Sequence, residues 1–142
     1  MDPVRFGIVG LGMGRNRSRI VSQTEGASLE AVCDLNEELL DEVAEEFEAE
    51  KFTDVEEMID SDSIDVVYVI TPSGAHLEII EKAAKAGKHV ITTKPMEITV
   101  DRSQQCIDVC EENDVTLIVD FQMRYNGELQ QWKAALDNNE LG

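Results

Sequence analysis

The chain has 142 residues, of which 42% are hydrophobic and 30% are charged. This balance excludes a disordered chain, and no apolar run is long enough for a membrane protein. The sequence carries 30 acidic and 12 basic residues, for a net charge of −18, and repulsion of this size argues against nucleic acid or an anionic membrane as a partner.

The cysteines and histidines do not form a metal-binding pattern. Cys33, Cys106 and Cys110 are an odd set, and His76 and His89 have no ligand-like spacing to them. We therefore predict core thiols and no bound metal. The N-terminus leads directly into a strand pattern and lacks the order of a secretory signal, which predicts a cytoplasmic protein. The acid-rich composition would also suit a high-salt cytoplasm.

The first third of the chain predicts two strands that each lead into a helix. Val4–Val9 is an apolar, β-branched run that fits a strand buried on both faces. A helix over Arg15–Gln23 follows, and Leu29–Cys33 forms the second strand. Asn36 can cap the next helix, whose apolar residues over 39–47 fall on one face.

The rest of the chain alternates in the same way. We expect a weak strand over Lys51–Thr53 and then a short helical turn over Val55–Ile59. Three further strands follow, over Asp65–Ile70, His89–Thr93 and Val115–Val119. Helices over Ala75–Ala86 and Asp101–Asn113 separate these three strands. This alternation predicts an α/β fold, a doubly wound, mainly parallel six-stranded Rossmann sheet with helices on both faces. Ligands bind such sheets at the carboxyl ends of the strands, near the point where the strand order reverses.

A glycine-rich segment joins the first strand to the first helix. Gly10, Gly12, Met13 and Gly14 let the backbone approach a phosphate, and the helix N-terminus supplies N–H donors there. The segment departs from the dinucleotide fingerprint G-x-G-x-x-G, because Arg15 stands where the third glycine would be. We expect these residues to bind the cofactor's pyrophosphate, with Arg15 as a further phosphate contact.

A single acidic residue after the second strand indicates which dinucleotide is bound. Asp34 follows the glycines by about 20 residues, where a carboxylate can accept hydrogen bonds from ribose hydroxyls and repel a 2′-phosphate. NAD is therefore favoured over NADP. A glycine-rich loop followed by such an acid also occurs in S-adenosylmethionine-dependent methyltransferases, but their loop usually carries an acidic residue where this sequence has Ile8.

Later segments resemble the Gfo/Idh/MocA family of oxidoreductases in both residues and spacing. They are Thr71-Pro72-Ser73-Gly74-Ala75-His76, Ala86-Gly87-Lys88-His89-Val90 and Lys94-Pro95. The resemblance implies that Thr71, Pro72, Ser73 and His76 line the cofactor cleft. It also implies that Lys94 is a catalytic residue that reaches the nicotinamide and the substrate.

Some positions depart from the family's usual residues. Thr93 stands in place of a glutamate, so a threonine hydroxyl is expected to contact the cofactor there. Ser73 stands in place of an asparagine, and the segment that begins at Asp120 lacks the usual glycine. That segment leaves Gln122 and Arg124 as candidate cleft residues, with Gln122 assigned to the cofactor.

The end of the chain predicts a helix with an apolar stripe formed by Leu129, Trp132 and Leu136. We expect residues 1–121 to form the dinucleotide-binding domain and residues 122–142 a helix that connects it to a separate C-terminal substrate domain. The resemblance implies an NAD-dependent dehydrogenase acting on a sugar, cyclitol or related polyol, with the isolated chain inactive. A non-catalytic nucleotide-sensing or interaction module is the alternative. Exposed apolar surface could also drive homo-oligomer formation.

Overall fold

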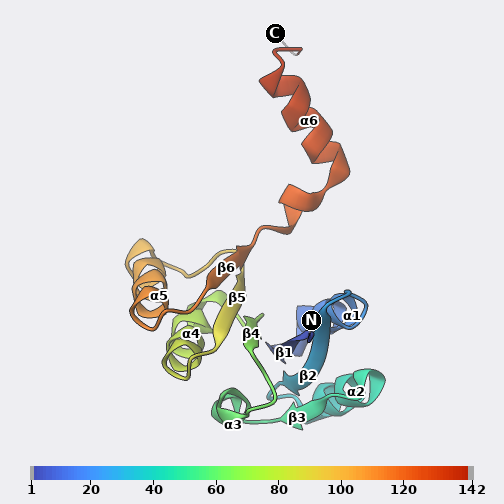
Figure 1. Ribbon diagram of the computed structural model, residues 1–142, viewed down its shortest axis with the longest axis vertical. Helices are drawn as coiled ribbons and strands as arrows, with labels where there is room; N and C mark the ends of the chain where they lie inside the picture. Colours follow the sequence, from blue (N-terminus) through green and yellow to red (C-terminus); the bar gives the residue numbers. More distant parts are fainter. Residues whose placement is uncertain (1, 141–142) are drawn as a thin grey trace.

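Six strands form one sheet in the order β3-β2-β1-β4-β5-β6, and every neighbouring pair is parallel (Figure 1). The computed structural model describes residues 2–140. The strands are β1 (Val4–Val9), β2 (Ala27–Cys33), β3 (Glu50–Phe52), β4 (Val66–Val69), β5 (His89–Thr93) and β6 (Leu117–Asp120). The order reverses between β1 and β4, as in Rossmann sheets, so the expected fold is confirmed and the sheet is wholly parallel.

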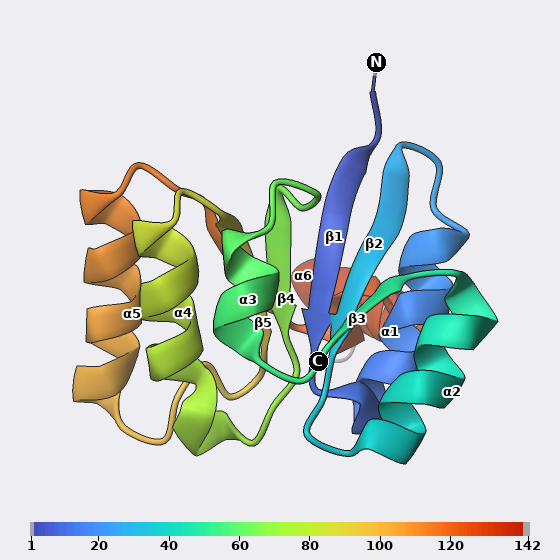
Figure 2. The same cartoon turned by 90° about the horizontal axis from the view of Figure 1, so that it is seen from below.

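Helices cover both faces of the sheet (Figure 2). One face carries α1 (Leu11–Ser22) and α2 (Glu37–Phe47), and the other carries α3 (Val55–Asp60), α4 (His76–Lys85) and α5 (Val100–Glu112). Short 3-10 turns, η1 (Ser73–Ala75) and η2 (Gln122–Tyr125), precede α4 and α6 (Gly127–Asp137). A helix therefore joins each strand to the next one along the chain.

Strand β4 shows how the sheet separates two apolar layers. All four of its residues are buried. Val67 and Val69 pack in the layer beneath α3, α4 and α5, whereas Tyr68 and Ile70, the residue after the strand, pack in the layer beneath α1 and α2. This alternation follows from the two-residue period of a strand, and burial on both faces explains why the sequence is a continuous apolar run.

Most predicted helix ends are confirmed by their capping contacts. The Asn36 side chain accepts a hydrogen bond from the Leu39 amide at 3.2 Å, and Gly87 follows the end of α4 with a φ of +74°. The start of the first helix differs from the prediction. α1 begins at Leu11 rather than Arg15, so the glycine-rich segment forms its first turn instead of a loop.

An ion pair between Arg5 and Asp65 fastens β1 to the start of β4. The guanidinium donates to both carboxylate oxygens, at 3.0 Å and 2.6 Å, and the Arg5 amide donates to the same side chain at 3.0 Å. The Arg5 side chain lowers the pKa of Asp65 from its usual 3.8 to about 2. This contact stabilises the N-terminal ends of the strands, away from the edge expected to bind ligands.

The Asp65→Asn variant is expected to unfold at a modestly lower urea concentration than the parent at pH 7. Because the folded-state pKa of Asp65 lies below its unfolded value, its contribution is present above about pH 4 and is lost as the pH falls toward 2. The difference in urea midpoint, followed by circular dichroism, should therefore shrink over that range. A difference that stayed constant from pH 7 to pH 2.5 would contradict the assignment.

The last helix stands apart from the sheet and its covering helices (Figure 1). None of its residues is buried, and Trp132 and Leu136 are 64% and 61% exposed. The predicted helix and its apolar stripe are thus present, although the expected boundary of the connecting segment extends to residues 141–142, outside the described residues. No helix within residues 2–140 is long and apolar enough to cross a membrane.

Candidate functional site

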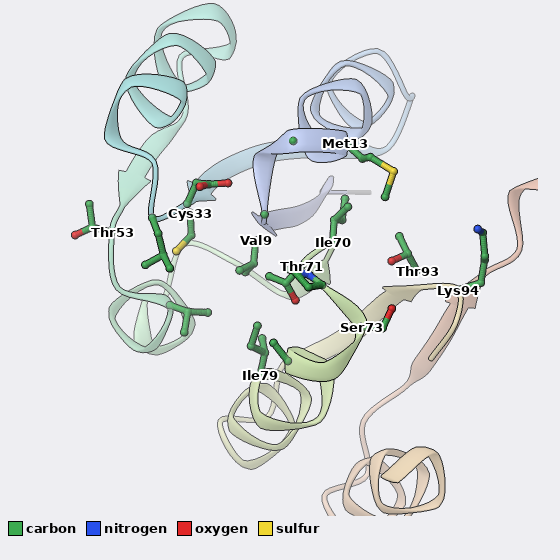
Figure 3. Close-up of a pocket in the computed structure, with 17 residues that line it drawn as sticks. Val9, Met13, Cys33, Thr53, Ile70, Thr71, Ser73, Ile79, Thr93 and Lys94 are labelled. Carbon is green, nitrogen blue, oxygen red and sulfur yellow. The ribbon is translucent and has the colours of Figure 1, made fainter. Parts of the chain in front are cut away.

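A cavity of about 680 Å³ opens where β1, β2, β4 and β5 end (Figure 3). It brings together most of the residues expected at the site, namely Gly10, Gly12, Met13, Asp34, Thr71, Pro72, Ser73, Thr93 and Lys94. Thr53 and Lys94 lie on opposite sides of it. The cavity therefore has two distinguishable ends, one beside β2 and β3 and the other beside β5.

Gly10 forms the corner between β1 and α1. Its φ is +88°, and its amide donates to the Cys33 carbonyl at 2.9 Å. A Cβ built at Gly10 would lie 2.7 Å from the carbonyl oxygen of Ile70. Only glycine fits this corner without strain, because β1 and the end of β4 approach each other too closely for a side chain.

The first turn of α1 presents backbone amides to the cavity. The amides of a helix's first turn have no acceptor within the helix, and they carry the positive end of the helix dipole. Leu11 donates its amide to the Asp34 carboxylate at 2.6 Å, and Gly12 and Met13 follow at the cavity wall. A Cβ built at Gly12 meets no atom within 4 Å. The space above this turn is therefore open to a phosphate group.

The Asp34 carboxylate is fixed at the cavity edge by two backbone amides. One oxygen accepts from Leu11 and the other from Asn36, at 2.6 Å and 2.8 Å. A carboxylate has about four acceptor positions, so two remain for a ligand hydroxyl. Cys33 lies beside it, and burial raises the pKa of its thiol to about 11, which keeps that neighbour uncharged.

At the opposite end, two strand ends face each other across the cavity. Thr71, Pro72 and Ser73 follow β4, Thr93 is the last residue of β5, and Lys94 follows it. The Thr71 hydroxyl is buried without a hydrogen-bond partner among residues 2–140. Because a buried hydroxyl without a partner is costly, this orphan fits a ligand that supplies the missing hydrogen bond.

Gln122 lies in a second, smaller cavity of about 270 Å³ rather than in the large one. Met13, Thr93 and Lys94 border both cavities, and Arg17 borders the smaller one. Together with Ile70, these three residues form the boundary between the large cavity and the adjoining smaller one.

A partly buried polar cluster beside the smaller cavity was not anticipated from the sequence. The Tyr68 hydroxyl donates to Asp120 at 2.6 Å, and Arg17 contacts both groups at 3.1 Å. Burial and the bond to Asp120 raise the pKa of Tyr68 to about 12. The three residues come from α1, β4 and β6, so only the folded sheet brings them together.

Besides Gln122, three further expected cofactor contacts lie outside the large cavity. Gly14 packs against β1, since a Cβ there would lie 3.2 Å from the side chain of Ile8. Arg15 donates to Glu46 at 2.8 Å and to Glu42 at 3.0 Å, because the acidic face of α2 lies beside α1. His76 is fully buried, with its ring nitrogens 2.9 Å and 2.8 Å from backbone carbonyl oxygens.

No metal-binding group was found in the described part of the chain. Residues 2–140 contain no cluster of three or more His, Cys, Asp or Glu side chains placed to hold an ion. The three cysteines are free and buried. The large cavity is lined by backbone amides, hydroxyl groups, the Cys33 thiol, the Asp34 carboxylate and the Lys94 side chain.

Comparison with protein families matches residues 4–121 to the Gfo/Idh/MocA model, described as an oxidoreductase family with an NAD-binding Rossmann fold. The matched range begins at β1 and ends one residue after β6. It therefore covers the whole sheet and both cavity ends.

Known proteins are similar over nearly all of this chain. A D-xylose 1-dehydrogenase (NADP(+)) of Haloarcula marismortui is 31% identical, over 99% of this chain and 41% of its own length. The scyllo-inositol dehydrogenase of Lactobacillus casei, solved with NAD(H) and scyllo-inositol, is 28% identical with a TM-score of 0.91, over 99% of this chain and 43% of its own. The WlbA dehydrogenase of Bordetella pertussis, solved with NADH and UDP-GlcNAcA, is 31% identical with a TM-score of 0.91, over 99% and 41%. The chain spans about two fifths of the length of these relatives.

Proposed function

The chain belongs to the Gfo/Idh/MocA family of oxidoreductases with an NAD-binding Rossmann fold, and on that premise we propose that its large cavity binds NAD(H). We further propose that the protein transfers hydride between this cofactor and a sugar, cyclitol or related polyol. The observation that carries the proposal is the open first turn of α1 beside Asp34, at the point where the strand order reverses.

We propose a direction for the cofactor along the cavity. The adenosine ribose lies at Asp34, whose two remaining acceptor positions suit two neighbouring hydroxyls. The pyrophosphate lies over Gly12 and Met13, where helix amides attract negative charge. The nicotinamide half lies between Thr71 and Lys94, and the Thr71 hydroxyl then gains a partner. The orphan hydroxyl and the open space at Gly12 both support this fit.

Lys94 is the proposed catalytic residue. Bound NAD⁺ would supply the hydride acceptor. Lys94 is exposed and borders both cavities, so its ammonium group can reach the nicotinamide end of one and a substrate in the other. A hydrogen bond from this group to the reacting oxygen would stabilise negative charge that develops there. Gln122 and Arg17 border the smaller cavity and supply further polar contacts for a substrate.

The setting of this domain in the whole protein is also part of the proposal. We propose that residues 1–121 form the dinucleotide-binding domain and that residues 122–142 connect it to a substrate domain. The extra length of the relatives and the isolated position of α6 support this division. Three free cysteines support a reducing compartment such as the cytoplasm. The net charge supports the absence of a nucleic-acid partner, and exposed Trp132 and Leu136 support self-association.

Asp34→Ala is expected to narrow a preference for NADH over NADPH. The parent should bind NADH about tenfold or more tightly than NADPH, because the carboxylate accepts from the ribose and repels a 2′-phosphate. The variant should reduce that ratio to about threefold or less. Binding is best followed by the fluorescence of the reduced nicotinamide, since the single tryptophan, Trp132, lies on α6 away from the cavity.

Two further variants sharpen this test. Asp34→Asn keeps an acceptor for the Leu11 amide but removes the charge, and it should behave like the alanine variant toward NADPH. Asp41→Ala removes an exposed carboxylate of α2 that pairs with Lys51, and it should leave the ratio unchanged. Failure of the parent to bind either nucleotide at millimolar concentration would refute the proposed function. If Asp34→Ala kept the parent's preference for NADH over NADPH, only the assignment of Asp34 to the adenosine ribose would be refuted.

A further inference from the structure

The segment that carries Lys94 is irregular and is held in place from outside. It runs from the end of β5 to Thr99, the residue that caps α5. The Lys94 side chain is exposed, and within residues 2–140 its ammonium group makes no hydrogen bond or ion pair. Its position therefore depends on the contacts of the residues that follow it.

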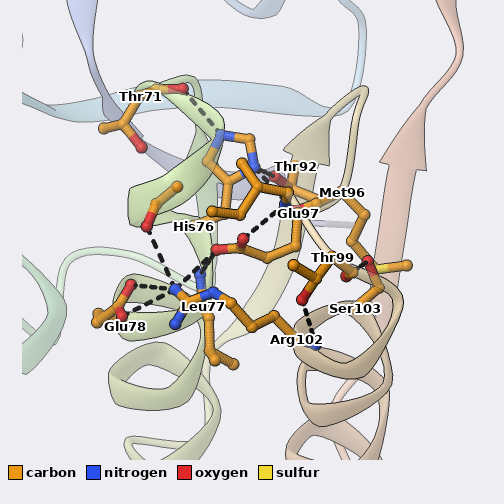
Figure 4. Close-up of polar contacts among 12 residues, drawn as sticks. Thr71, His76, Leu77, Glu78, Thr92, Met96, Glu97, Thr99, Arg102 and Ser103 are labelled. Carbon is orange, nitrogen blue, oxygen red and sulfur yellow. Dashed lines mark hydrogen bonds and ion pairs between the residues drawn. The ribbon is translucent and has the colours of Figure 1, made fainter.

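Glu97 supplies the strongest of these contacts (Figure 4). Its side chain is 0% exposed. One carboxylate oxygen accepts from the Leu77 amide at 3.1 Å and from Arg102 at 3.0 Å, and the other accepts from the Ile98 amide at 2.7 Å. The bond from Arg102 lowers the pKa of Glu97 to about 2. A buried carboxylate with this many donors is charged and tightly oriented.

Arg102 extends the contact to the other wall of the cavity. The terminal nitrogen that reaches Glu97 also lies 3.2 Å from the carbonyl oxygen of Gly74 and 2.8 Å from Glu78. Gly74 stands between Ser73 and Ala75, both of which border the cavity. The Glu97–Arg102 pair therefore joins the segment after β5 to the segment after β4.

His76 makes a second connection between the same two walls. One ring nitrogen lies 2.9 Å from the carbonyl oxygen of Met96, and the other lies 2.8 Å from that of Thr71. The ring is fully buried. Figure 4 shows the imidazole between Thr71 and the segment that carries Glu97. Both connections act at the end of the cavity that holds Lys94, and neither involves Asp34.

We propose that Glu97 is a positioning residue that, with Arg102 as its partner, fixes Lys94 and the Thr71 wall for the nicotinamide half of the cofactor. This inference rests on the proposed function, because it assigns the Lys94 end of the cavity to the nicotinamide. If Glu97 had only a structural role, its replacement would lower the stability of the domain and would weaken the binding of both halves of a dinucleotide to the same extent. A positioning role affects the nicotinamide half alone.

The test compares two nucleotides on the 142-residue chain. NADH occupies both ends of the cavity, whereas ADP carries only the adenosine and the pyrophosphate. We expect Glu97→Gln to weaken NADH binding by about tenfold, as for residues that orient a ligand-contacting group, and to change ADP binding by less than about twofold. NADH is followed by its fluorescence and ADP by titration calorimetry.

A double-mutant cycle tests whether Glu97 acts through Lys94. Glu97→Gln should lower NADH affinity strongly in the parent but only slightly in a Lys94→Ala background, because two residues that act through one another do not have additive effects. If the two losses of NADH affinity add in full, Glu97 does not act through Lys94 and the proposal is wrong. Glu81→Gln is the matched control, since it removes a carboxylate of α4 that pairs with Lys85. It should change neither nucleotide's affinity.

The outcomes separate the two proposals. If the parent binds neither nucleotide, the proposed function is wrong and this inference falls with it. If the parent binds and Glu97→Gln weakens both nucleotides equally or neither, only this inference is wrong. If circular dichroism shows that Glu97→Gln does not fold, Arg102→Lys decides the question. It keeps the charge but loses the guanidinium geometry that joins Glu97 to Gly74, and it should show the same selective loss of NADH.

Discussion

Replacing Gly10 by alanine is expected to destabilise the domain by about 3 kcal/mol or more, a large part of the total of about 5–15 kcal/mol of a typical domain. The added Cβ would lie 2.7 Å from the carbonyl oxygen of Ile70 and 2.8 Å from its carbonyl carbon. Both atoms are backbone, so relief requires the end of β4 to move away from β1 at the centre of the sheet. The φ of +88° adds strain for any residue with a side chain.

A second glycine separates the two causes of this loss. Gly26 has a φ of +81°, but a Cβ there meets no atom within 4 Å. Gly26→Ala should therefore lose only the backbone term, about 1 kcal/mol. Unfolding in urea, followed by circular dichroism, measures both variants. If Gly10→Ala lost no more than Gly26→Ala, the close approach of β1 to Ile70 would not limit this position.

The fold was predictable because its signals are local. β-branched apolar runs separated by helical patterns predict parallel strands, and the alternation along β4 places its side chains in both layers. The start of α1 was placed too late. Glycine is a poor helix former, so the sequence predicted no helix before Arg15. In the structure the Leu11 amide donates to Asp34, which is distant in the sequence, and this contact stabilises the first turn.

The site was predictable where strand ends bring residues together, and it was not where a side chain has a choice of partners. Asp34, Thr71 and Lys94 face one cavity because parallel strands end at the same edge. Arg15 turns instead to the acidic face of α2. The role of Glu97 could not be predicted from the sequence, because a single acidic residue in a loop forms no periodic pattern. Its partners come from α4 and α5, which only the fold brings to it. The cofactor contacts themselves stay predictions.

Gly12→Ala is expected to have the opposite signature from Gly10→Ala, with a fold that is retained and a nucleotide site that is lost. A Cβ at Gly12 meets no atom within 4 Å, and alanine is the better helix former, so stability should be unchanged or slightly raised. The same methyl group would stand in the space proposed for the pyrophosphate. NADH affinity should fall by about tenfold or more, because the phosphate can no longer approach the first-turn amides.

The choice of nucleotide makes this expectation specific. ADP also carries the pyrophosphate, so Gly12→Ala should weaken ADP and NADH by similar factors, whereas Glu97→Gln should spare ADP. Gly127→Ala, in the first turn of α6, is the matched control, since its Cβ also meets nothing within 4 Å and α6 lies away from the cavity. It should leave both affinities unchanged. If Gly12→Ala bound NADH as tightly as the parent, the pyrophosphate would have to lie elsewhere. The glycine segment would then not be the phosphate site.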